Sequence, residues 1–219
     1  MVKSAPAVLW MLGVAGVALT LTAEVLLRLC RGSTGRLREV LFFPCPAACV
    51  ERLFAAGRSP CPCPLPHGVE TSFSRLLSHL LSARVSVDVC MFAFAHPQLR
   101  RALLLLRGRG LAVRVLCDRD YVKVNGSQIG LLRKQGVCVR HDVSAVVHMH
   151  HKFAVLDGRT LLTGSLNWTT NAVQNNAENV LVTDEPALVR PYRREFQRLW
   201  DAADPDRKCP QQPGPEPPV

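Results

Sequence analysis

The chain is poor in acidic residues. Its 219 residues include 17 Asp and Glu against 27 Lys and Arg, which gives a formal net charge of +10 at pH 7. A basic balance of this size indicates an anionic partner, either a nucleic acid, a phospholipid or both. Charged residues make up only 20% and hydrophobic residues 48%, which excludes wholesale disorder. The nine cysteines are an odd number, which does not suit a closed disulfide framework. The length allows one medium domain with accessories, not two full-sized domains.

A stretch without any charge runs from residue 5 to residue 23. About 20 apolar residues span a bilayer, so we predict a membrane anchor over residues 1–31 that is barely long enough. A cleaved signal peptide is the alternative, but only Lys3 precedes the stretch and no small-x-small cleavage site stands before Arg28. Positive residues stay on the cytosolic side, and Arg28 and Arg31 follow the stretch closely. We therefore expect a single-pass protein whose remaining residues face the cytosol.

Strand and helix patterns alternate along the rest of the chain. Strand patterns cover 37–43, 85–94, 111–117, 137–140, 151–156 and 159–163, and helix patterns cover 71–83, 97–107, 128–135 and 186–203. Alternation of this kind predicts an α/β domain around a central sheet, which we place at residues 32–204. Residues 205–219 are rich in proline and predict a disordered tail.

Chemistry-bearing residues gather between His150 and Glu178. Asp157-Gly158 predicts a two-residue hairpin turn, whose register pairs Lys152 with Thr163 and His150 with Ser165. His150 and Lys152 are two residues apart in a strand, so both side chains should project from one face. An imidazole, an ammonium and a hydroxyl would then converge, as a phosphate site requires. Spacing alone leaves a second interpretation open, because histidines in strands are often simply exposed polar residues.

The residues His150-x-Lys152-x₄-Asp157 resemble the HxKxxxxD motif of the phospholipase D superfamily, and Gly164-Ser165-x-Asn167 and Glu178 stand where that family has further site residues. The resemblance implies an α/β fold with a central mixed sheet flanked by helices. It also implies catalysis through a phosphohistidine without a metal ion. The implied roles are attack on phosphorus or proton transfer for His150, phosphate binding for Lys152 and Asn167, support for Ser165, imidazole orientation for Glu178 and a structural role for Asp157.

A second copy of the motif is absent, and we find no internal repeat. Sites of this superfamily use two motifs, so we predict a homodimer in which each subunit supplies one motif to a shared site. An inactive relic is the alternative, but the intact set of motif residues argues against it.

A Cys/Pro-rich insert covers residues 44–68. Cys49, Cys61, Cys63 and His67 would make a tetrahedral Zn²⁺ set, with Cys45 as an alternative ligand. Such a zinc would be structural, because the protein would supply every ligand. Unliganded surface thiols are the alternative interpretation.

The anchor, the insert and the single motif together resemble a mitochondrial branch of the superfamily. This resemblance implies the outer mitochondrial membrane and two candidate substrates. One is single-stranded RNA, cut to leave 5′-phosphate ends in piRNA biogenesis, and the other is cardiolipin, an anionic phospholipid that would be hydrolysed to phosphatidic acid. Few aromatic faces should lie near the site, namely those of Phe92, Phe94, Tyr121 and Trp168, so a nuclease would read the backbone rather than stack on bases.

Basic residues would guide either substrate to the site. They include Arg100, Arg101, Arg107, Arg109, Arg114, Lys123, Arg133 and Lys134. A lipid enzyme should offer an apolar entry for acyl chains, and beyond the anchor we expect no exposed apolar segment, which favours the nuclease. A non-catalytic membrane scaffold is a third class, which an inert His150→Ala variant would favour.

Overall fold

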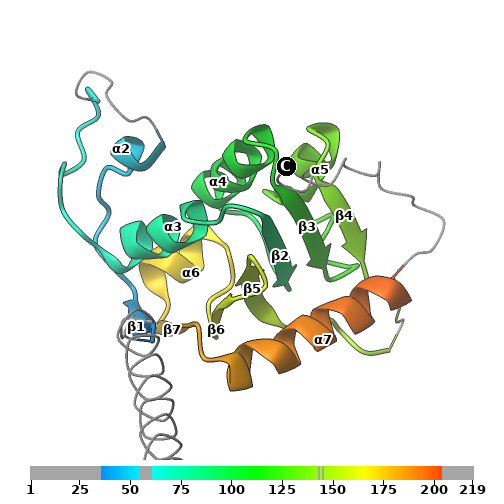
Figure 1. The fold of residues 1–219 in the computed structure, drawn as a ribbon. Coiled ribbons are helices and arrows are strands. Elements are labelled where there is room, and N and C mark those ends of the chain that lie inside the picture. The colour runs from blue at the N-terminus through cyan, green and yellow to red at the C-terminus, as the bar shows by residue number, and fades with distance from the viewer. Residues whose placement is uncertain (1–35, 55–60, 143, 145, 204–219) are drawn as a thin grey trace, which may run out of the picture. The chain divides into compact units, whose positions relative to one another are not determined.

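The structure is a computed structural model that describes residues 36–54, 61–142, 144 and 146–203 (Figure 1). The predicted anchor at 1–31 and the predicted tail at 205–219 lie outside the described residues. Within the described ranges, no helix has both the length and the apolar character needed to cross a membrane.

A seven-stranded sheet forms the centre of residues 37–203. Its strands are β1 (Arg38–Phe43), β2 (Ser86–Met91), β3 (Ala112–Cys117), β4 (Cys138–His141), β5 (Lys152–Leu156), β6 (Thr160–Gly164) and β7 (Glu178–Thr183). Their order is β1-β7-β6-β5-β2-β3-β4. The β2–β3 and β3–β4 pairs are parallel and the other four are antiparallel, so the predicted mixed sheet is confirmed.

Among the described residues, six helices accompany the sheet: α2 (Glu51–Phe54), α3 (Ser72–Leu81), α4 (Pro97–Gly108), α5 (Ile129–Lys134), α6 (Thr170–Asn175) and α7 (Pro186–Ala202). Local sequence fixes several of their ends. Thr71 and Ser74 form a reciprocal capping box at the start of α3. His96 caps α4 through its ring, and Pro97 occupies the first turn, where its missing N–H costs nothing.

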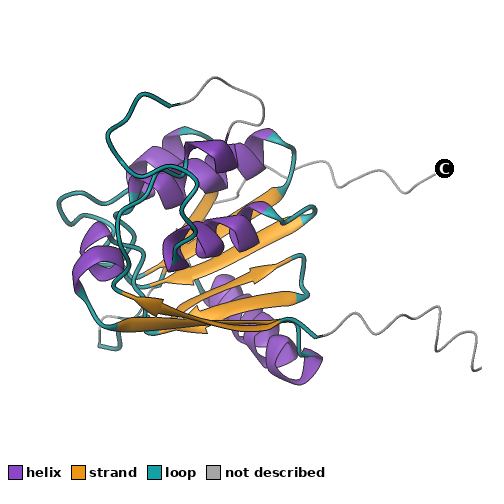
Figure 2. Ribbon diagram, turned by 90° about the vertical axis from the view of Figure 1, so that its left-hand side faces the viewer, coloured by secondary structure: helices purple, strands orange, loops and turns teal. Residues whose placement is uncertain are grey.

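The sheet separates two hydrophobic cores, with α3 to α6 on one face and α7 on the other (Figure 2). Alternation along β2 shows how one strand serves both, because Val87 and Val89 join the first core and Cys90 joins the second. Phe196 and Trp200 of α7 pack in the second core with Phe153. The predicted helices and strands all occur, with ends that differ by up to three residues. The short helices α2 and α6 and the strand β7 were not predicted.

The β5–β6 hairpin corrects the predicted register. Asp157 and Gly158 have φ values of 52° and 62°, and the Arg159 N–H donates to the Leu156 carbonyl at 2.8 Å, so the expected turn is present. The ladder nevertheless pairs Leu156 with Thr160, one residue beyond the position that a two-residue turn dictates. Thr163 therefore lies opposite Phe153 rather than Lys152, and its hydroxyl donates to Tyr192 of α7 at 3.2 Å. An extra residue after the turn produces such a shift.

Candidate active site

The motif residues lie at one edge of the sheet. Lys152 is the first residue of β5 and His150 precedes it, while Ser165 and Asn167 follow the end of β6 and Glu178 begins β7. Because β5, β6 and β7 are antiparallel neighbours, the end of one strand lies beside the start of the next. The topology thus brings these five residues to the same edge.

His150 and Lys152 are in direct contact. Lys152 Nζ lies 3.1 Å from His150 Nδ1 and 3.3 Å from Nε2, and it donates to the His150 carbonyl at 2.8 Å. Phe92, just beyond the end of β2, supports both groups: its ring centroid is 4.3 Å from that of His150 and 4.9 Å from Lys152 Nζ. A cation held on an aromatic face beside an imidazole is positioned to receive an anion.

Partial burial lowers the pKa of both basic groups. Desolvation lowers the pKa of Lys152, and the Glu178 carboxylate opposes that shift. The pKa of His150 is lowered first by desolvation and then by the charge on Lys152. A lowered pKa increases the neutral fraction of an imidazole near pH 7, and only the neutral form can attack phosphorus.

Gly164 allows β6 and β7 to approach closely beside the site. A Cβ at this position would lie 2.0 Å from the Asn179 carbonyl oxygen. The Ser165 N–H donates to that same oxygen at 3.1 Å, and the Asn179 N–H donates to Ser165 Oγ at 3.1 Å. Asn176 Nδ2 donates to Glu178 Oε1 at 3.1 Å. These bonds fix Ser165 and Glu178 on the two neighbouring strands.

Asn167 and Asp157 have different surroundings. Asn167 Oδ1 is shielded from solvent and has no hydrogen-bond partner among the described residues. Asp157 lies at the other end of β5, where Oδ1 accepts from the backbone N–H groups of Val85 at 2.7 Å, Ser86 at 2.9 Å and Arg84 at 3.1 Å. A carboxylate bound to three backbone amides ties the hairpin turn to the start of β2.

Two flanking histidines each lie near a carboxylate. His148 Nδ1 is 3.0 Å from Oδ2 of Asp118, whose side chain is buried. His151 Nε2 is 3.5 Å from Glu195 Oε1 on α7. Sequence reasoning missed Asp118. The available signal was its position directly after a buried parallel strand, β3, where site residues of open sheets gather.

The predicted aromatic and basic surfaces are smaller than expected. Phe94 and Trp168 are buried against each other, with ring centroids 5.2 Å apart, so they offer no face to a substrate. Arg101 is paired with Glu51 and Arg114 with Asp88, each through two hydrogen bonds. The charges of these two arginines are therefore already compensated within the domain.

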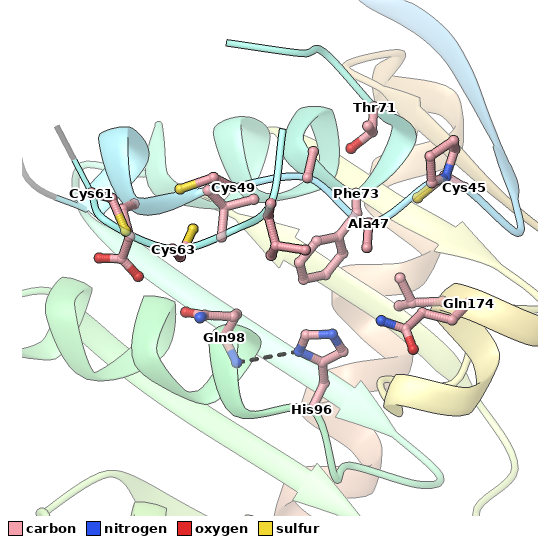
Figure 3. Close-up of a pocket in the computed structure, with 16 residues that line it drawn as sticks. Cys45, Ala47, Cys49, Cys61, Cys63, Thr71, Phe73, His96, Gln98 and Gln174 are labelled. Atoms are coloured by element: carbon pink, nitrogen blue, oxygen red, sulfur yellow. Dashed lines mark hydrogen bonds between the residues drawn. The ribbon is translucent and has the colours of Figure 1, made fainter. Parts of the chain in front are cut away.

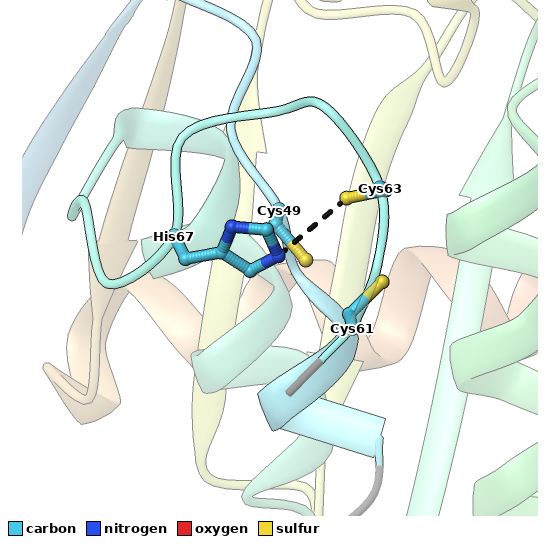
Figure 4. Close-up of side chains that lie close together, drawn as sticks. All are labelled: Cys49, Cys61, Cys63 and His67. Carbon is cyan, nitrogen blue, oxygen red and sulfur yellow. Dashed lines mark hydrogen bonds between the residues drawn. The ribbon is translucent and has the colours of Figure 1, made fainter. Parts of the chain in front are cut away.

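The insert brings four potential metal ligands together. One ligand atom from each of Cys49, Cys61, Cys63 and His67 lies within 4.8 Å of all the others (Figure 4). Cys63 Sγ and His67 Nε2 are 3.6 Å apart, and tetrahedral zinc with ordinary bond lengths separates a sulfur and a nitrogen ligand by about 3.6 Å. The residues therefore fit a zinc ion. Cys45 is not in this group and packs against the first core.

A cavity of about 310 Å³ lies between the insert and the body of the domain (Figure 3). Cys49, Cys61 and Cys63 line its insert side, and Phe73 and His96 line the opposite side. Burial lowers the pKa of His96 to about 4, so this ring is neutral. His96 Nδ1 accepts from the Gln98 N–H at 3.2 Å, which requires the proton of the neutral ring to be on Nε2.

A mixed sheet with helices on both faces, and a His-x-Lys motif at its edge, define a phosphodiesterase of the phospholipase D type. The family model described as "Cardiolipin synthase, PLD-like domain" matches residues 76–200, and the chain belongs to this family. It is 59% identical over 198 residues to the mitochondrial cardiolipin hydrolase of Danio rerio, covering 89% of this chain and 87% of that protein. The corresponding human protein is 52% identical over 204 residues, covering 88% of this chain and 80% of that protein.

A solved structure agrees on the fold. The phospholipase D family member Nuc from Salmonella typhimurium superposes with a TM-score of 0.62 at 23% identity, covering 79% of this chain and 99% of Nuc. The family match and the two relatives, not this structure, confirm the resemblance inferred from the sequence motif at the level of family and enzyme class.

Proposed function

We propose that the chain hydrolyses cardiolipin to phosphatidic acid at the outer mitochondrial membrane, with its catalytic domain facing the cytosol. The observation that carries the proposal is the His150–Lys152 pair on Phe92, in a chain whose relatives are named mitochondrial cardiolipin hydrolases.

An apolar surface beside the site also supports a lipid substrate. Val146 is 91% and Val147 is 69% exposed, four and three residues before His150. This finding corrects the expectation that no apolar segment would be exposed beyond the anchor. Two exposed valines offer a contact for acyl chains where the substrate phosphate would enter.

The chemistry follows from the proposed roles. A ring nitrogen of His150 attacks phosphorus, and the P–O bond to the leaving glycerol breaks as that oxygen takes a proton. The P–N bond of the resulting phosphohistidine then breaks when water attacks and yields its proton. Lys152 and Asn167 bind the phosphate oxygens, Ser165 supports them and Glu178 orients the imidazole. The products are phosphatidic acid and phosphatidylglycerol, and no metal ion takes part.

Proton transfer in both steps requires a second imidazole, and we propose that His150 of a second copy provides it. General acid help is typically worth about 10²–10⁴-fold, which a site with one histidine would forgo. A two-fold axis through the site would bring both copies of His150 and Lys152 around one phosphate. Heterodimers of wild-type and His150→Asn chains test this arrangement. A composite site predicts activity near that of the double variant, whereas half the wild-type rate would exclude it.

Hydrolysis of cardiolipin vesicles in excess EDTA tests the main proposal. The full chain should release phosphatidic acid, His150→Asn should abolish release, and His141→Gln serves as a folded control. A Val146→Ser/Val147→Ser variant should lose activity on vesicles while still cleaving a soluble phosphodiester. An absolute requirement for added Mg²⁺, or a failure to release phosphatidic acid, contradicts the proposal.

Single-stranded RNA is a second candidate substrate, cut to leave 5′-phosphate ends in piRNA biogenesis. Tyr121 favours it, because this half-buried ring packs on Phe92 with centroids 4.0 Å apart, and Lys123 is exposed two residues later. One aromatic face and a cation could hold a nucleotide beside His150. Labelled RNA in the same EDTA assay decides: 5′-phosphate products that disappear with His150→Asn support this substrate, and intact RNA excludes it.

A structural Zn²⁺ in the insert and a single-pass anchor over residues 1–31 complete the proposal. Zinc held by Cys49, Cys61, Cys63 and His67 would fix the insert. Protease added to intact mitochondria should digest the catalytic domain. Protection until the outer membrane is ruptured would contradict the topology.

A further inference from the structure

A buried carboxylate holds the histidine that precedes the motif. Asp118 is 1% exposed, and its Oδ1 accepts from the backbone N–H groups of Asp120 at 2.9 Å and Tyr121 at 3.3 Å. Its other oxygen, Oδ2, lies 3.0 Å from His148 Nδ1. The carboxylate is thus fixed by the backbone and presents one oxygen to the imidazole. A carboxylate in this position sets the orientation and the tautomer of a histidine.

His148 faces His150 across one aromatic ring. The centroid of Phe92 is 6.0 Å from that of His148, in an edge-on arrangement, and 4.3 Å from that of His150. Both histidines also line one cleft of about 340 Å³. A charge on His148 therefore acts on His150 within one cleft, where water that reaches both exposed side chains partly screens it.

We propose that the Asp118–His148 pair is a positioning element of the active site that sets the pH range over which His150 is neutral. The inference rests on the proposed function, in which His150 attacks phosphorus. A cation on His148 disfavours a proton on His150, whereas the Asp118 carboxylate favours one. The two effects oppose each other in the intact pair, so removing either partner leaves the other uncompensated.

Other charged groups near the two histidines are largely paired with each other. Lys152 contacts His150, and the charged or titratable groups that line the cleft with His150 are His148, His151, Glu195, Arg198 and Asp142; Glu195 is 3.5 Å from His151 and 2.7 Å from Arg198. The groups facing His148 are Asp118, Asp120, Arg119 and Asp142; Asp120 is 3.7 Å from Arg119 and its Oδ2 is 3.9 Å from His148 Nδ1. Arg119 also donates its backbone N–H to Asp142 at 2.7 Å.

Asp118 is the carboxylate bound directly to His148 and the most buried of these groups. The groups that act on the pKa of His150 agree with the opposing effects of His148 and Asp118. The pKa of His150 is lowered by desolvation, Lys152 and His148, and Asp118 acts in the opposite direction.

Two isosteric variants of the full chain test the proposal, because they should move the pH midpoint of His150 in opposite directions. His148→Gln removes the imidazole but leaves the Asp118 charge. Asp118→Asn removes the charge but keeps an oxygen for the two backbone amides. His141→Gln, at the end of β4, is the control. One measurement is the pH profile of kcat/KM for phosphodiester hydrolysis. The other needs no substrate: the pH dependence of diethyl pyrocarbonate modification at His150, resolved by tandem mass spectrometry, because this reagent modifies neutral imidazole.

We expect His148→Gln to move the His150 midpoint upward by roughly half to one pH unit, and Asp118→Asn to move it downward by a similar amount. His141→Gln should move neither measurement. An unmoved midpoint in His148→Gln, or a rate lowered equally at every pH, overturns the proposal because either result assigns the pair a purely structural role. If Asp118→Asn does not fold, the exposed His148→Gln change decides alone. Midpoints that move as expected without phosphodiester cleavage support the inference while refuting the proposed function.

Discussion

Replacing Gly164 by alanine should damage the site through the backbone of the neighbouring strand. The added Cβ would lie 2.0 Å from the Asn179 carbonyl oxygen, 2.8 Å from its carbon and 3.1 Å from Val180 Cα. An ordinary contact needs about 3.4 Å, so β6 and β7 must separate by more than 1 Å. All three obstructing atoms belong to the backbone, so no side-chain rotation can relieve the clash.

The size of the effect follows from that displacement. Overpacking of this kind costs about 1–3 kcal/mol of stability, and occasionally more. The same movement breaks the bond from the Ser165 N–H to the Asn179 oxygen, which is 3.1 Å long. It also shifts Ser165 relative to Glu178, and a misplacement of about 1 Å in a catalytic site can reduce the rate about 10²-fold. We therefore expect Gly164→Ala to lose both stability and kcat.

Urea denaturation and phosphodiester hydrolysis measure the two losses. Gly130→Ala is a matched control, because Gly130 lies in α5 and its added Cβ would meet nothing within 4 Å. Alanine should stabilise that helix by about 0.4–1 kcal/mol and leave the rate unchanged. If Gly164→Ala unfolds at the wild-type urea concentration and retains the wild-type rate, the close approach of β6 and β7 is not needed, and the reasoning is refuted.

Three further predictions concern stability and metal binding. Burial lowers the pKa of His96 to about 4, so the unfolded state binds more protons between about pH 4 and pH 6.5. Stability should therefore fall as the pH drops through that window. The wild type should lose about 2 kcal/mol more than His96→Asn between pH 7.5 and 5 in urea denaturation, and equal losses would contradict this cause. Cys61→Ser should release about one zinc per chain by elemental analysis and lower Tm, whereas Cys45→Ser should keep the metal; a metal-free wild type refutes the zinc set. Asp157→Asn should cost about 1–3 kcal/mol through its contacts with Arg84, Val85 and Ser86 while largely retaining kcat, so a lost rate in the folded variant would assign Asp157 a direct role.

Local signals in the sequence determined much of the architecture. Hydrophobic periodicity, Pro97 at a helix start and the Asp157-Gly158 turn each act within a few residues, so the corresponding elements could be predicted. The spacing of His150 and Lys152 placed them on one face of the predicted strand, and the structure brings them into contact. The Cys/His spacing indicated a ligand cluster. It could not decide between Cys45 and Cys49, because that choice depends on how the insert packs against the core.

Only the tertiary structure decided which distant residues complete the site. The register of β5 and β6 differs by one residue from the predicted pairing, because the ladder depends on packing along both strands as well as on the turn. Asp118 reaches His148 across 30 residues, and Asn179 reaches Ser165 across 14, through strand pairings that no local pattern encodes. Arg114 looked like a free cation in the sequence, but folding sets it against Asp88 on the adjacent strand. Side-chain propensities act over a few residues, whereas these contacts arise only when the sheet assembles, and this is why the sequence identified the motif and the fold identified its partners.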